Sequence, residues 1–222
     1  MTKPDNINSM ISMLDKYIGT FDWGSLTKSK QTILDSFLRV ATSEGIANVS
    51  MRTLASAAGV KPPTIYSHFP GGRDEIVSAA LHRHYNNFSK SLRQALHGCT
   101  CAEEYWASLV AFHVTQQLSK PENDLWDILI ATDRVNNSLD PELRREVNDW
   151  EEFCDQMYCA VARDLGHSNC TQDALVIRKT LDGIGSWWHW DGSEAHLNQA
   201  IDYAIVLTKH ILAIPKTVFS KV

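Results

Sequence analysis

The sequence predicts an all-α protein, with an N-terminal helix-turn-helix domain followed by a larger C-terminal helical domain. Three observations predict this fold class. Apolar residues recur with helical periodicity along almost the whole chain, and alternation typical of strands is not found. An Ala-x-x-x-Gly segment, Ala55 to Gly59, has the spacing of a helix-turn-helix. A very short helix then begins at two adjacent prolines, Pro62 and Pro63.

Most of the expected helices have a start or stop signal. Asp5 or Asn6 caps the first helix, which carries an apolar stripe and ends at Gly19; Gly45 ends the second helix. Asp140 followed by proline is a strong start signal for a later helix. The expected helices are Asp5–Ile18, Thr27–Glu44, Met51–Ala58, one from Pro63, one from Arg73 or Asp74 to Leu96, Ala102–Leu118, Asn123–Asn136, Pro141–Leu165, Gln172–Trp190 and Glu194–Ile214.

Charge is unevenly distributed along the 222 residues, whose net charge is −5. Residues 27–70 carry five Lys or Arg against two Asp or Glu, whereas residues 71–222 carry fourteen against twenty-one. A small basic module on an acidic body indicates an anionic partner for one end only. We therefore expect three segments: an extension with an amphipathic helix (1–26), a basic helix-turn-helix domain (27–73) and a larger acidic helical domain (74–222). The resemblance described below implies DNA binding for the second segment and effector binding and dimerisation for the third.

The expected cellular environment is the cytoplasm, with reduced thiols. The N-terminus has no apolar signal-peptide core, and no apolar run approaches the ~18 residues of a membrane helix. The five cysteines are an odd number in a sizeable chain, which favours free thiols over a disulfide framework.

The helix that begins at Pro63 presents a face suited to a DNA groove. At about 100° per residue, Ile65 and Phe69 lie within about 40° of each other and form the buried side. Pro63 and the small polar residues Thr64 and Ser67 lie opposite. Tyr66 and His68 flank this face, where they could reach phosphates, although packing against neighbouring helices is the alternative interpretation. The preceding helix adds Ser50, Arg52 and Thr53, and Arg52 could bind a guanine bidentately.

The run "MRTLASAAGVKPPTIYSHFPGGRDEIVSAAL" resembles the N-terminal signature of TetR-type transcriptional regulators. The resemblance implies homodimers that bind palindromic operators, usually as repressors, and that a small molecule releases from DNA. By matching position, it implies DNA contacts by Arg52, Thr64, Tyr66 and His68, with Lys28 near a phosphate. With the flanking polar and basic residues, the expected DNA-binding set is Lys28, Ser50, Arg52, Thr53, Lys61, Pro63, Thr64, Tyr66, Ser67, His68 and Arg73.

This chain departs from the family pattern at two places. The family usually has a lysine before the next helix, where this chain has Gly72, and Arg73 is the candidate substitute. Pro62 and Pro63 replace residues that are often polar, so they can offer only apolar contacts.

The last helices carry apolar stripes that predict the dimer interface, in agreement with the family's usual four-helix interface. The expected interface residues are Val176, Thr180, Gly183, Trp187, Trp190, Ile201 and Ile205. Aromatic residues of the acidic body predict a pocket for an apolar, flat or cationic effector, although ordinary core packing is the alternative. The expected pocket residues are Trp106, His113, Trp126, Phe153 and Trp188.

Other functions have less support. A DNA-binding protein of the same fold without an effector, in an architectural or division-control role, stays an open alternative. No nucleophile, metal or phosphate motif indicates an enzyme. His82-x-His84, Cys99-x-Cys101 and His189-Trp190-Asp191 match no zinc spacing, so we expect no metal and no cofactor.

Overall fold

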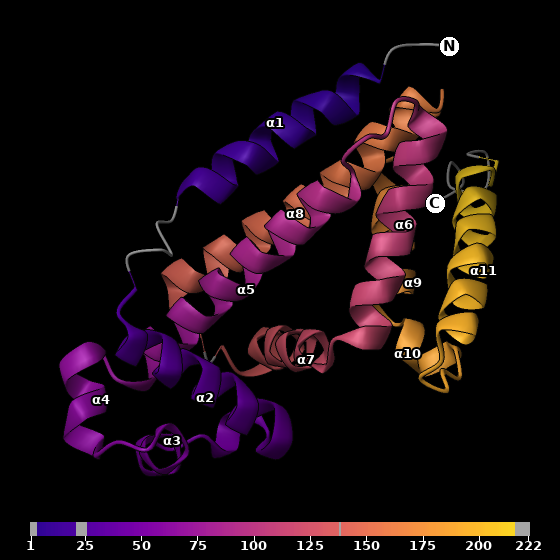
Figure 1. Ribbon diagram of the computed structural model, residues 1–222. Coiled ribbons are helices and arrows are strands. Elements are labelled where there is room, and N and C mark those ends of the chain that lie inside the picture. The colour runs from indigo at the N-terminus through magenta and orange to yellow at the C-terminus, as the bar shows by residue number, and fades with distance from the viewer. Residues whose placement is uncertain (1–3, 21–25, 138, 216–222) are drawn as a thin grey trace. The chain divides into compact units, whose positions relative to one another are not determined.

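The computed structural model describes residues 4–20, 26–137 and 139–215, and these residues form helices and short connections without any β-strand (Figure 1). The all-α prediction is therefore confirmed. The elements are α1 (Asp5–Thr20), α2 (Lys28–Glu44), the 3-10 helix η2 (Ile46–Asn48), α3 (Met51–Ala58), α4 (Pro62–His68), α5 (Arg73–Ala95), α6 (Ala102–Ser119), α7 (Pro121–Asn136), α8 (Pro141–Asp164), α9 (Thr171–Asp182), α10 (Ile184–Trp187) and α11 (Glu194–Leu212).

The helix expected over residues 172–190 is interrupted, so this prediction is wrong. α9 ends at Asp182, and only the single turn of α10 follows Gly183. In a continuous helix the carbonyl of Thr180 would accept the amide of Ile184. Instead it accepts the indole N–H of Trp187 at 2.9 Å, and the carbonyl of Gly183 accepts the hydroxyl of Ser186 at 2.6 Å. At Thr180 a side-chain donor thus replaces the backbone donor, whereas the carbonyl of Gly183 also accepts the backbone amide of Ser186 at 2.9 Å.

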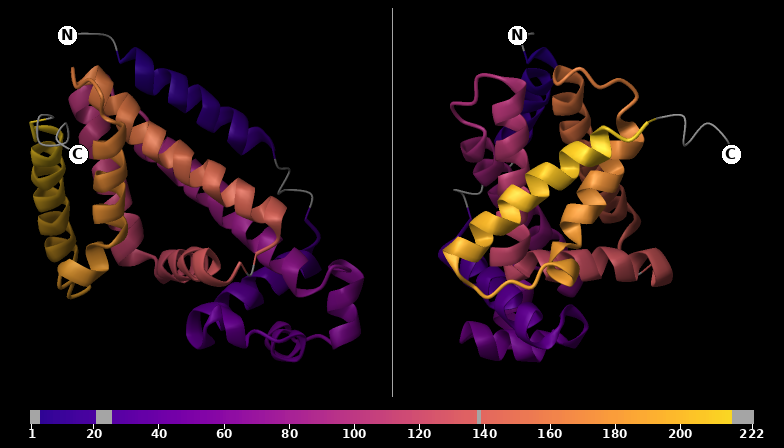
Figure 2. Two further views of the ribbon diagram at one scale, coloured as in Figure 1. Left: turned by 180° about the vertical axis from the view of Figure 1, so that it is seen from behind. Right: turned by 90° about the vertical axis from the view of Figure 1, so that its right-hand side faces the viewer.

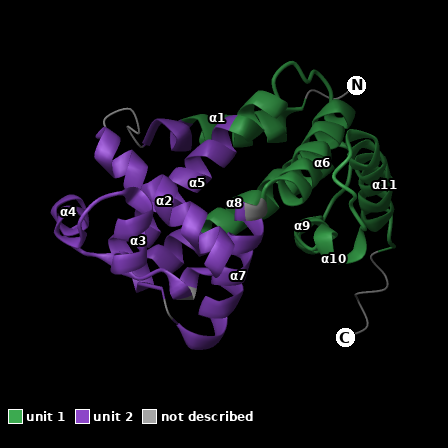
Figure 3. Cartoon of the chain, turned by 60° about the horizontal axis from the view of Figure 1, so that its bottom comes forward, with its two compact units in different colours: residues 1–15, 91–120, 149–222 green, residues 16–90, 121–148 purple. Residues whose placement is uncertain are grey.

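The chain divides into two compact units that are interleaved along the sequence (Figure 3). Unit 1 comprises residues 1–15, 91–120 and 149–222, and unit 2 comprises residues 16–90 and 121–148. α1, α5 and α8 each contribute residues to both units. The segment boundaries expected at 26/27 and 73/74 do not coincide with the limits of these compact units. The expected segments stay a prediction.

The core of unit 2 includes the buried faces of the helix-turn-helix elements. α2 packs against α3, α4 and α7. Ile33, Leu34 and Phe37 on α2 are buried, as are Leu54 on α3 and Ile65 on α4. The apolar spacing read from the sequence therefore selects the faces that are buried here, which leaves the opposite face of α4 exposed.

Unit 1 is a group of helices in which α6 packs along α11 and against α9 (Figures 1 and 2). Trp106 of α6 is fully buried, and its indole N–H donates to the hydroxyl of Thr208 on α11 at 3.2 Å. Its ring also makes an edge contact with Tyr158 of α8, with centroids 5.8 Å apart. Trp106 is therefore a core residue that joins α6 to α11.

The beginning of α1 is docked on unit 1 through a carboxylate of α8. Asp164 accepts the amide N–H groups of Asn6 and Ile7 at 3.2 and 2.9 Å and the side-chain amide of Asn6 at 2.6 Å. A buried carboxylate at a helix N-terminus satisfies donors that have no partner within the helix. Ile7 and Leu14 are fully buried. The apolar stripe predicted for this extension is thus a packing surface.

Two of the five cysteines are paired, so the expectation of reduced thiols is wrong for them. Cys159 of α8 and Cys170, which precedes α9, form a disulfide with a Cα–Cα distance of 5.5 Å. The turn between α8 and α9 brings them together, and nothing in their spacing signals it. Cys99, Cys101 and Cys154 are free, and burial raises the pKa of the Cys154 thiol to about 12. None of the helices in the described part of the chain is long and apolar enough to cross a membrane.

Candidate nucleic-acid interface

α3 begins with a reciprocal capping box that fixes its N-terminus. The hydroxyl of Ser50 accepts the amide of Thr53 at 3.1 Å, and the hydroxyl of Thr53 accepts the amide of Ser50 at 2.9 Å. The Thr53 hydroxyl also donates to the carbonyl of Ser50 at 2.9 Å. Both side chains are exposed, but their hydrogen bonds are already used within the cap. Their main effect is to position Arg52, which is exposed beside them.

The turn between α3 and α4 depends on one glycine. Gly59 has a φ of +67°, in the left-handed region that side chains rarely adopt. The amides of Gly59 and Val60 then bond back to the carbonyls of Ser56 and Ala55 at 3.2 and 3.0 Å, which closes the end of α3. This geometry sets the direction in which α4 leaves the turn.

α4 begins one residue earlier than predicted, at Pro62 rather than Pro63, and Lys61 is its extended N-cap. Two prolines are tolerated there because the first amides of a helix have no helical acceptor. The first amide that α4 possesses, on Thr64, donates to the carbonyl of Lys61 at 2.9 Å. Ile65 is fully buried, as predicted.

Phe69, directly after α4, is also buried, and a basic residue lies over it. The ammonium of Lys30 lies 5.3 Å from the Phe69 ring centroid, which is a cation–π distance. Helical periodicity alone does not indicate this contact. Lys30 on α2 is therefore partly used to hold the end of α4.

The outward face of α4 is made of small or weakly polar side chains. Pro63 and Ser67 are exposed, Thr64 and His68 are half-buried, and Tyr66 is 48% exposed. The hydroxyl of Ser67 donates to the carbonyl of Thr64 at 2.8 Å, so it can only accept from a partner. No other described side chain hydrogen-bonds Tyr66 or His68. The face is accessible and shallow, as a groove-reading helix requires.

Basic side chains surround this face. Lys28, Arg52 and Lys61 are exposed and form no ion pair with any of the described residues. Arg39 is different, because its guanidinium donates to the carbonyl of Ala57 at 2.8 Å and thereby ties α2 to α3. Lys28 and Lys61 can therefore meet phosphates, and Arg52 stays available for the expected base contact.

Comparisons with known proteins agree with this geometry. Residues 33–86 match the model for bacterial regulatory proteins of the tetR family. This segment of the chain is therefore similar to the N-terminal part of tetR-family regulators. No curated protein matches it.

Several solved structures of regulators share the fold of this chain. A tetR-family regulatory protein from Rhodococcus RHA1 has a TM-score of 0.69 at 14% identity and covers 84% of this chain and 98% of its own. A putative transcriptional regulator from Saccharomonospora viridis, in complex with choline, has a TM-score of 0.69 at 21% identity, covering 83% and 97%. AibR, in complex with isovaleryl coenzyme A and operator DNA, has a TM-score of 0.64 at 15% identity, covering 81% and 97%.

The departure from the TetR pattern at Gly72 has a structural explanation. Gly72 has a φ of +68°, and a Cβ there would lie 3.5 Å from the ring of Tyr66. A lysine would therefore be strained by the backbone rather than by lack of space. The neighbouring Arg73 is exposed, but one guanidinium nitrogen donates to the carbonyl of Ile46 at 3.0 Å. Arg73 thus also ties η2 to the start of α5.

The five predicted effector-pocket residues are divided between the units. Trp126 lies in unit 2, and Trp106, His113, Phe153 and Trp188 lie in unit 1. Trp106 belongs to the core described above. The indole N–H groups of Trp126 and Trp188 are buried and have no hydrogen-bond partner in the described part of the protein. These two tryptophans therefore keep a donor that a ligand could use.

His113 is held in a buried polar network of unit 1. Its two ring nitrogens lie 2.8 Å from the hydroxyl of Tyr158 and 3.0 Å from a carboxylate oxygen of Asp182. Burial opposes ionisation of Asp182, but the hydrogen bond to His113 and the charges of Arg178 and Lys179 outweigh it and lower its pKa to about 2. With both nitrogens engaged, His113 positions this network. Phe153 stacks on Trp150, with centroids 5.6 Å apart.

None of the seven predicted dimer-interface residues is buried within the chain. Val176 and Trp187 are exposed, and the others are partly exposed. Further large apolar side chains of α9 and α11 are exposed as well, namely Leu175, Tyr203 and Val206. An exposed apolar surface of this kind is typical of a protein–protein contact.

Proposed function

We propose that the protein is a DNA-binding transcriptional regulator that acts as a repressor in the cytoplasm. The observation that carries the proposal is the outward face of α4: it is small and accessible, it is flanked by Tyr66 and His68, and it lies beside an Arg52 held by a capped helix start. A side chain such as Arg52 can bind the O6 and N7 atoms of a guanine. Among the similar structures, AibR was solved with operator DNA.

We further propose that it acts as a homodimer on a palindromic operator. The exposed apolar side chains on α9, α10 and α11 support a self-complementary contact between two copies. Two recognition helices related by a two-fold axis would read half-sites about 34–36 Å apart, or a multiple of this distance.

Release by a small-molecule effector is the third part of the proposal. Buried polar atoms of unit 2 support an internal site, because the indole N–H of Trp126, the side-chain carbonyl of Asn86 and the hydroxyl of Ser89 have no hydrogen-bond partner among the described residues. Buried polar groups without partners are costly, and a ligand or water satisfies them. The acidic balance of residues 71–222 favours an apolar, flat or cationic effector over a polyanion.

The test of DNA binding begins with selection of the operator from a random DNA library by the purified protein. Gel-shift titration of the selected site then compares the wild type with Arg52→Ala and Tyr66→Phe. Loss of a bidentate base contact is expected to cost about 1–3 kcal/mol and to relax preference at one base pair. Arg163→Ala removes an exposed positive charge from unit 1 and serves as the matched control.

The folded state of each variant is checked by circular dichroism. If folded Arg52→Ala binds the selected operator as tightly as the wild type, Arg52 is not a base contact. Failure of the wild type to select any DNA sequence would overturn the proposed function itself. A thermal-shift screen of small molecules separates an effector-controlled repressor from a DNA-binding protein without an effector.

A further inference from the structure

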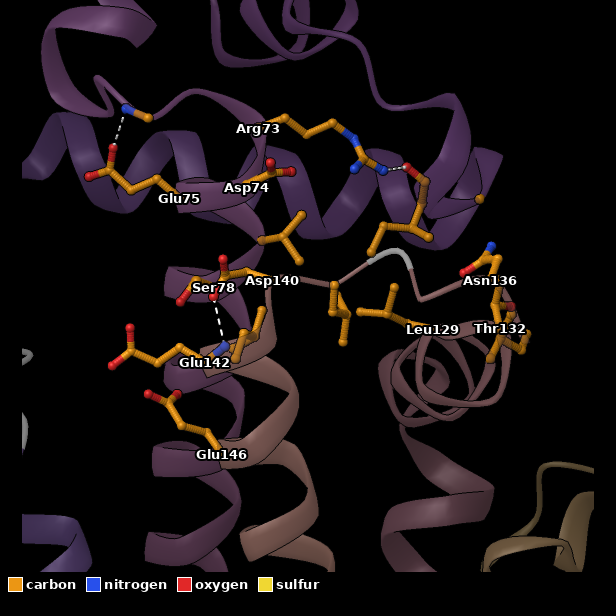
Figure 4. Close-up of a pocket in the computed structure, with 17 residues that line it drawn as sticks. Arg73, Asp74, Glu75, Ser78, Leu129, Thr132, Asn136, Asp140, Glu142 and Glu146 are labelled. Carbon is orange, nitrogen blue, oxygen red and sulfur yellow. Dashed lines mark hydrogen bonds between the residues drawn. The ribbon is translucent and has the colours of Figure 1, made fainter. Parts of the chain in front are cut away.

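A cavity of about 640 Å³ lies within unit 2 (Figure 4). Its lining comes from η2 and the preceding Gly45, from the turn before α5, from the first turns of α5 and α8, and from the second half of α7. This volume is within the range of about 300–1,000 Å³ typical of small-molecule sites. None of the predicted effector residues lines it, so it is a separate candidate site.

The cavity has an apolar base. Four buried apolar residues contribute to the lining: Val77 of α5, Leu129 of α7, Leu143 of α8 and Leu139, which lies just before α8. Ile128 also lines the cavity and is 61% exposed. A ligand with hydrocarbon parts would cover this exposed surface.

The charge of the lining is strongly one-sided. Five carboxylates line the cavity against one guanidinium, that of Arg73. Figure 4 shows the carboxylates on the side formed by α5 and α8, whereas α7 contributes neutral residues such as Thr132 and Asn136 on the other side. The five acidic residues are Asp74, Glu75, Asp140, Glu142 and Glu146.

Three of these carboxylates already have partners. Glu75 accepts the amide of Gly71 at 2.8 Å, Asp140 accepts the amide of Glu142 at 2.8 Å, and Glu146 is paired with His82.

The side chains of Asp74 and Glu142 are exposed and form no hydrogen bond or ion pair with the described residues. Arg73 does not neutralise them, because its guanidinium is directed to the carbonyl of Ile46 (Figure 4). Two carboxylates without a partner among the described residues, one on α5 and one on α8, therefore contribute to the lining of a cavity with an apolar base.

We propose that this cavity binds an elongated organic dication of the diamine or polyamine class. Its two ammonium groups pair with the carboxylates of Asp74 and Glu142, and its methylene chain covers the leucine base. An anion would be repelled by the carboxylates. A bare divalent metal requires about six oxygen ligands, and no three metal-ligating side chains come together among the described residues. Charge and hydrocarbon content together select an organic cation.

Ligand binding at this site would also affect the DNA-binding helices α3 and α4. This regulatory part of the proposal rests on the proposed function. η2 and the turn before α5 both line the cavity; the first leads directly into α3, and the second follows α4. These segments can have one arrangement that binds DNA and one that does not. A ligand that binds one arrangement more tightly would change the operator affinity by the difference between its two binding free energies. Binding to the cavity itself does not depend on any role in transcription.

The binding test uses the full chain without DNA, so its outcome is independent of the proposed function. Calorimetric titration with spermidine and putrescine is expected to show one saturable site per chain. The monoamine butylamine, which lacks the second ammonium, is expected to bind at least ten-fold more weakly.

Glu142→Gln and Asp74→Asn are each expected to weaken spermidine binding at least ten-fold. Glu194→Gln, which neutralises an exposed first-turn glutamate of α11 in unit 1, is the matched control and should bind as the wild type does. Thr132→Arg introduces a cation from the α7 side and should abolish binding even if the carboxylate variants fold poorly.

The proposal is overturned by the absence of saturable binding, by equal weakening in Glu194→Gln, or by Mg²⁺ competing as strongly as spermidine. The regulatory part is tested separately by gel shift. Because polyamines also screen DNA, the wild type and Glu142→Gln are compared at equal spermidine concentrations. An unequal response supports coupling to DNA binding, and an equal response excludes it.

Discussion

His84 is a base held neutral inside unit 2, and its pH dependence can be calculated. Its ring lies between aromatic neighbours, with centroids 5.7 Å from Trp126, 5.9 Å from Tyr85 and 6.3 Å from Phe88. Burial lowers the pKa of His84 from its ordinary value of 6.5 to about 4. The charged form is thus disfavoured only in the folded protein.

The sign of the effect follows from proton linkage. Below the unfolded pKa of 6.5, the unfolded chain binds a proton that the folded chain does not bind until about pH 4. The free energy of unfolding therefore falls as the pH drops through this window, and the effect is absent above it. For these two pKa values, the loss between about pH 7 and about pH 5 is about 2 kcal/mol.

The assay is urea unfolding at both pH values, with wild type and His84→Phe at the same protein concentration. Phenylalanine keeps an aromatic ring among aromatic neighbours and cannot titrate. The variant is expected to lose about 2 kcal/mol less stability than the wild type on acidification. His97→Gln, at an exposed position, should leave the pH dependence unchanged. If His84→Phe and the wild type lose the same stability, His84 is not a neutral buried base.

Three further outcomes are expected. Gly183→Arg should be monomeric in analytical ultracentrifugation while staying folded, because a Cβ there is 3.5 Å from its nearest neighbour; a dimer of wild-type affinity would contradict the proposed interface. Trp126→Phe should raise the effector concentration needed for operator release about ten-fold, and unchanged release would place Trp126 outside the site. Asp164→Ala removes the acceptor of three N–H donors and should cost about 2–4 kcal/mol; unchanged hydrogen-exchange protection at Asn6 and Ile7 would refute this.

The parts of the fold that could be predicted depend on local physics. Ser50, Gly59 and the Asp140-Pro141 pair act through their own backbone and nearest neighbours, so a cap or turn residue indicates the helix boundary. The break at Gly183 could not be predicted in this way. It requires the Trp187 indole to reach the Thr180 carbonyl, a side-chain competition that apolar periodicity does not encode.

Long-range partners account for the remaining differences. The helical wheel separates buried from exposed faces of α4 because that distinction is local. It cannot show that Trp106 bonds Thr208, that His113 lies between Tyr158 and Asp182, or that the hydroxyl of Thr53 is used by a cap. Residue type alone made these side chains candidates for ligand or DNA contact, and only the partners show how their polar atoms are used.

The two prolines that open α4 also affect how the protein would search DNA. Helix N-termini often hold phosphates through free amides, but Pro62 and Pro63 have none, and the amide of Thr64 is already bonded. Phosphate neutralisation then falls on two unpaired cations per chain, Lys28 and Lys61, because Arg52 is assigned to a base contact. Four such cations in a dimer would release condensed counterions and give a slope of log affinity against log salt of about −4. Such a protein would leave non-target DNA quickly, and its residence on an operator would depend on base contacts.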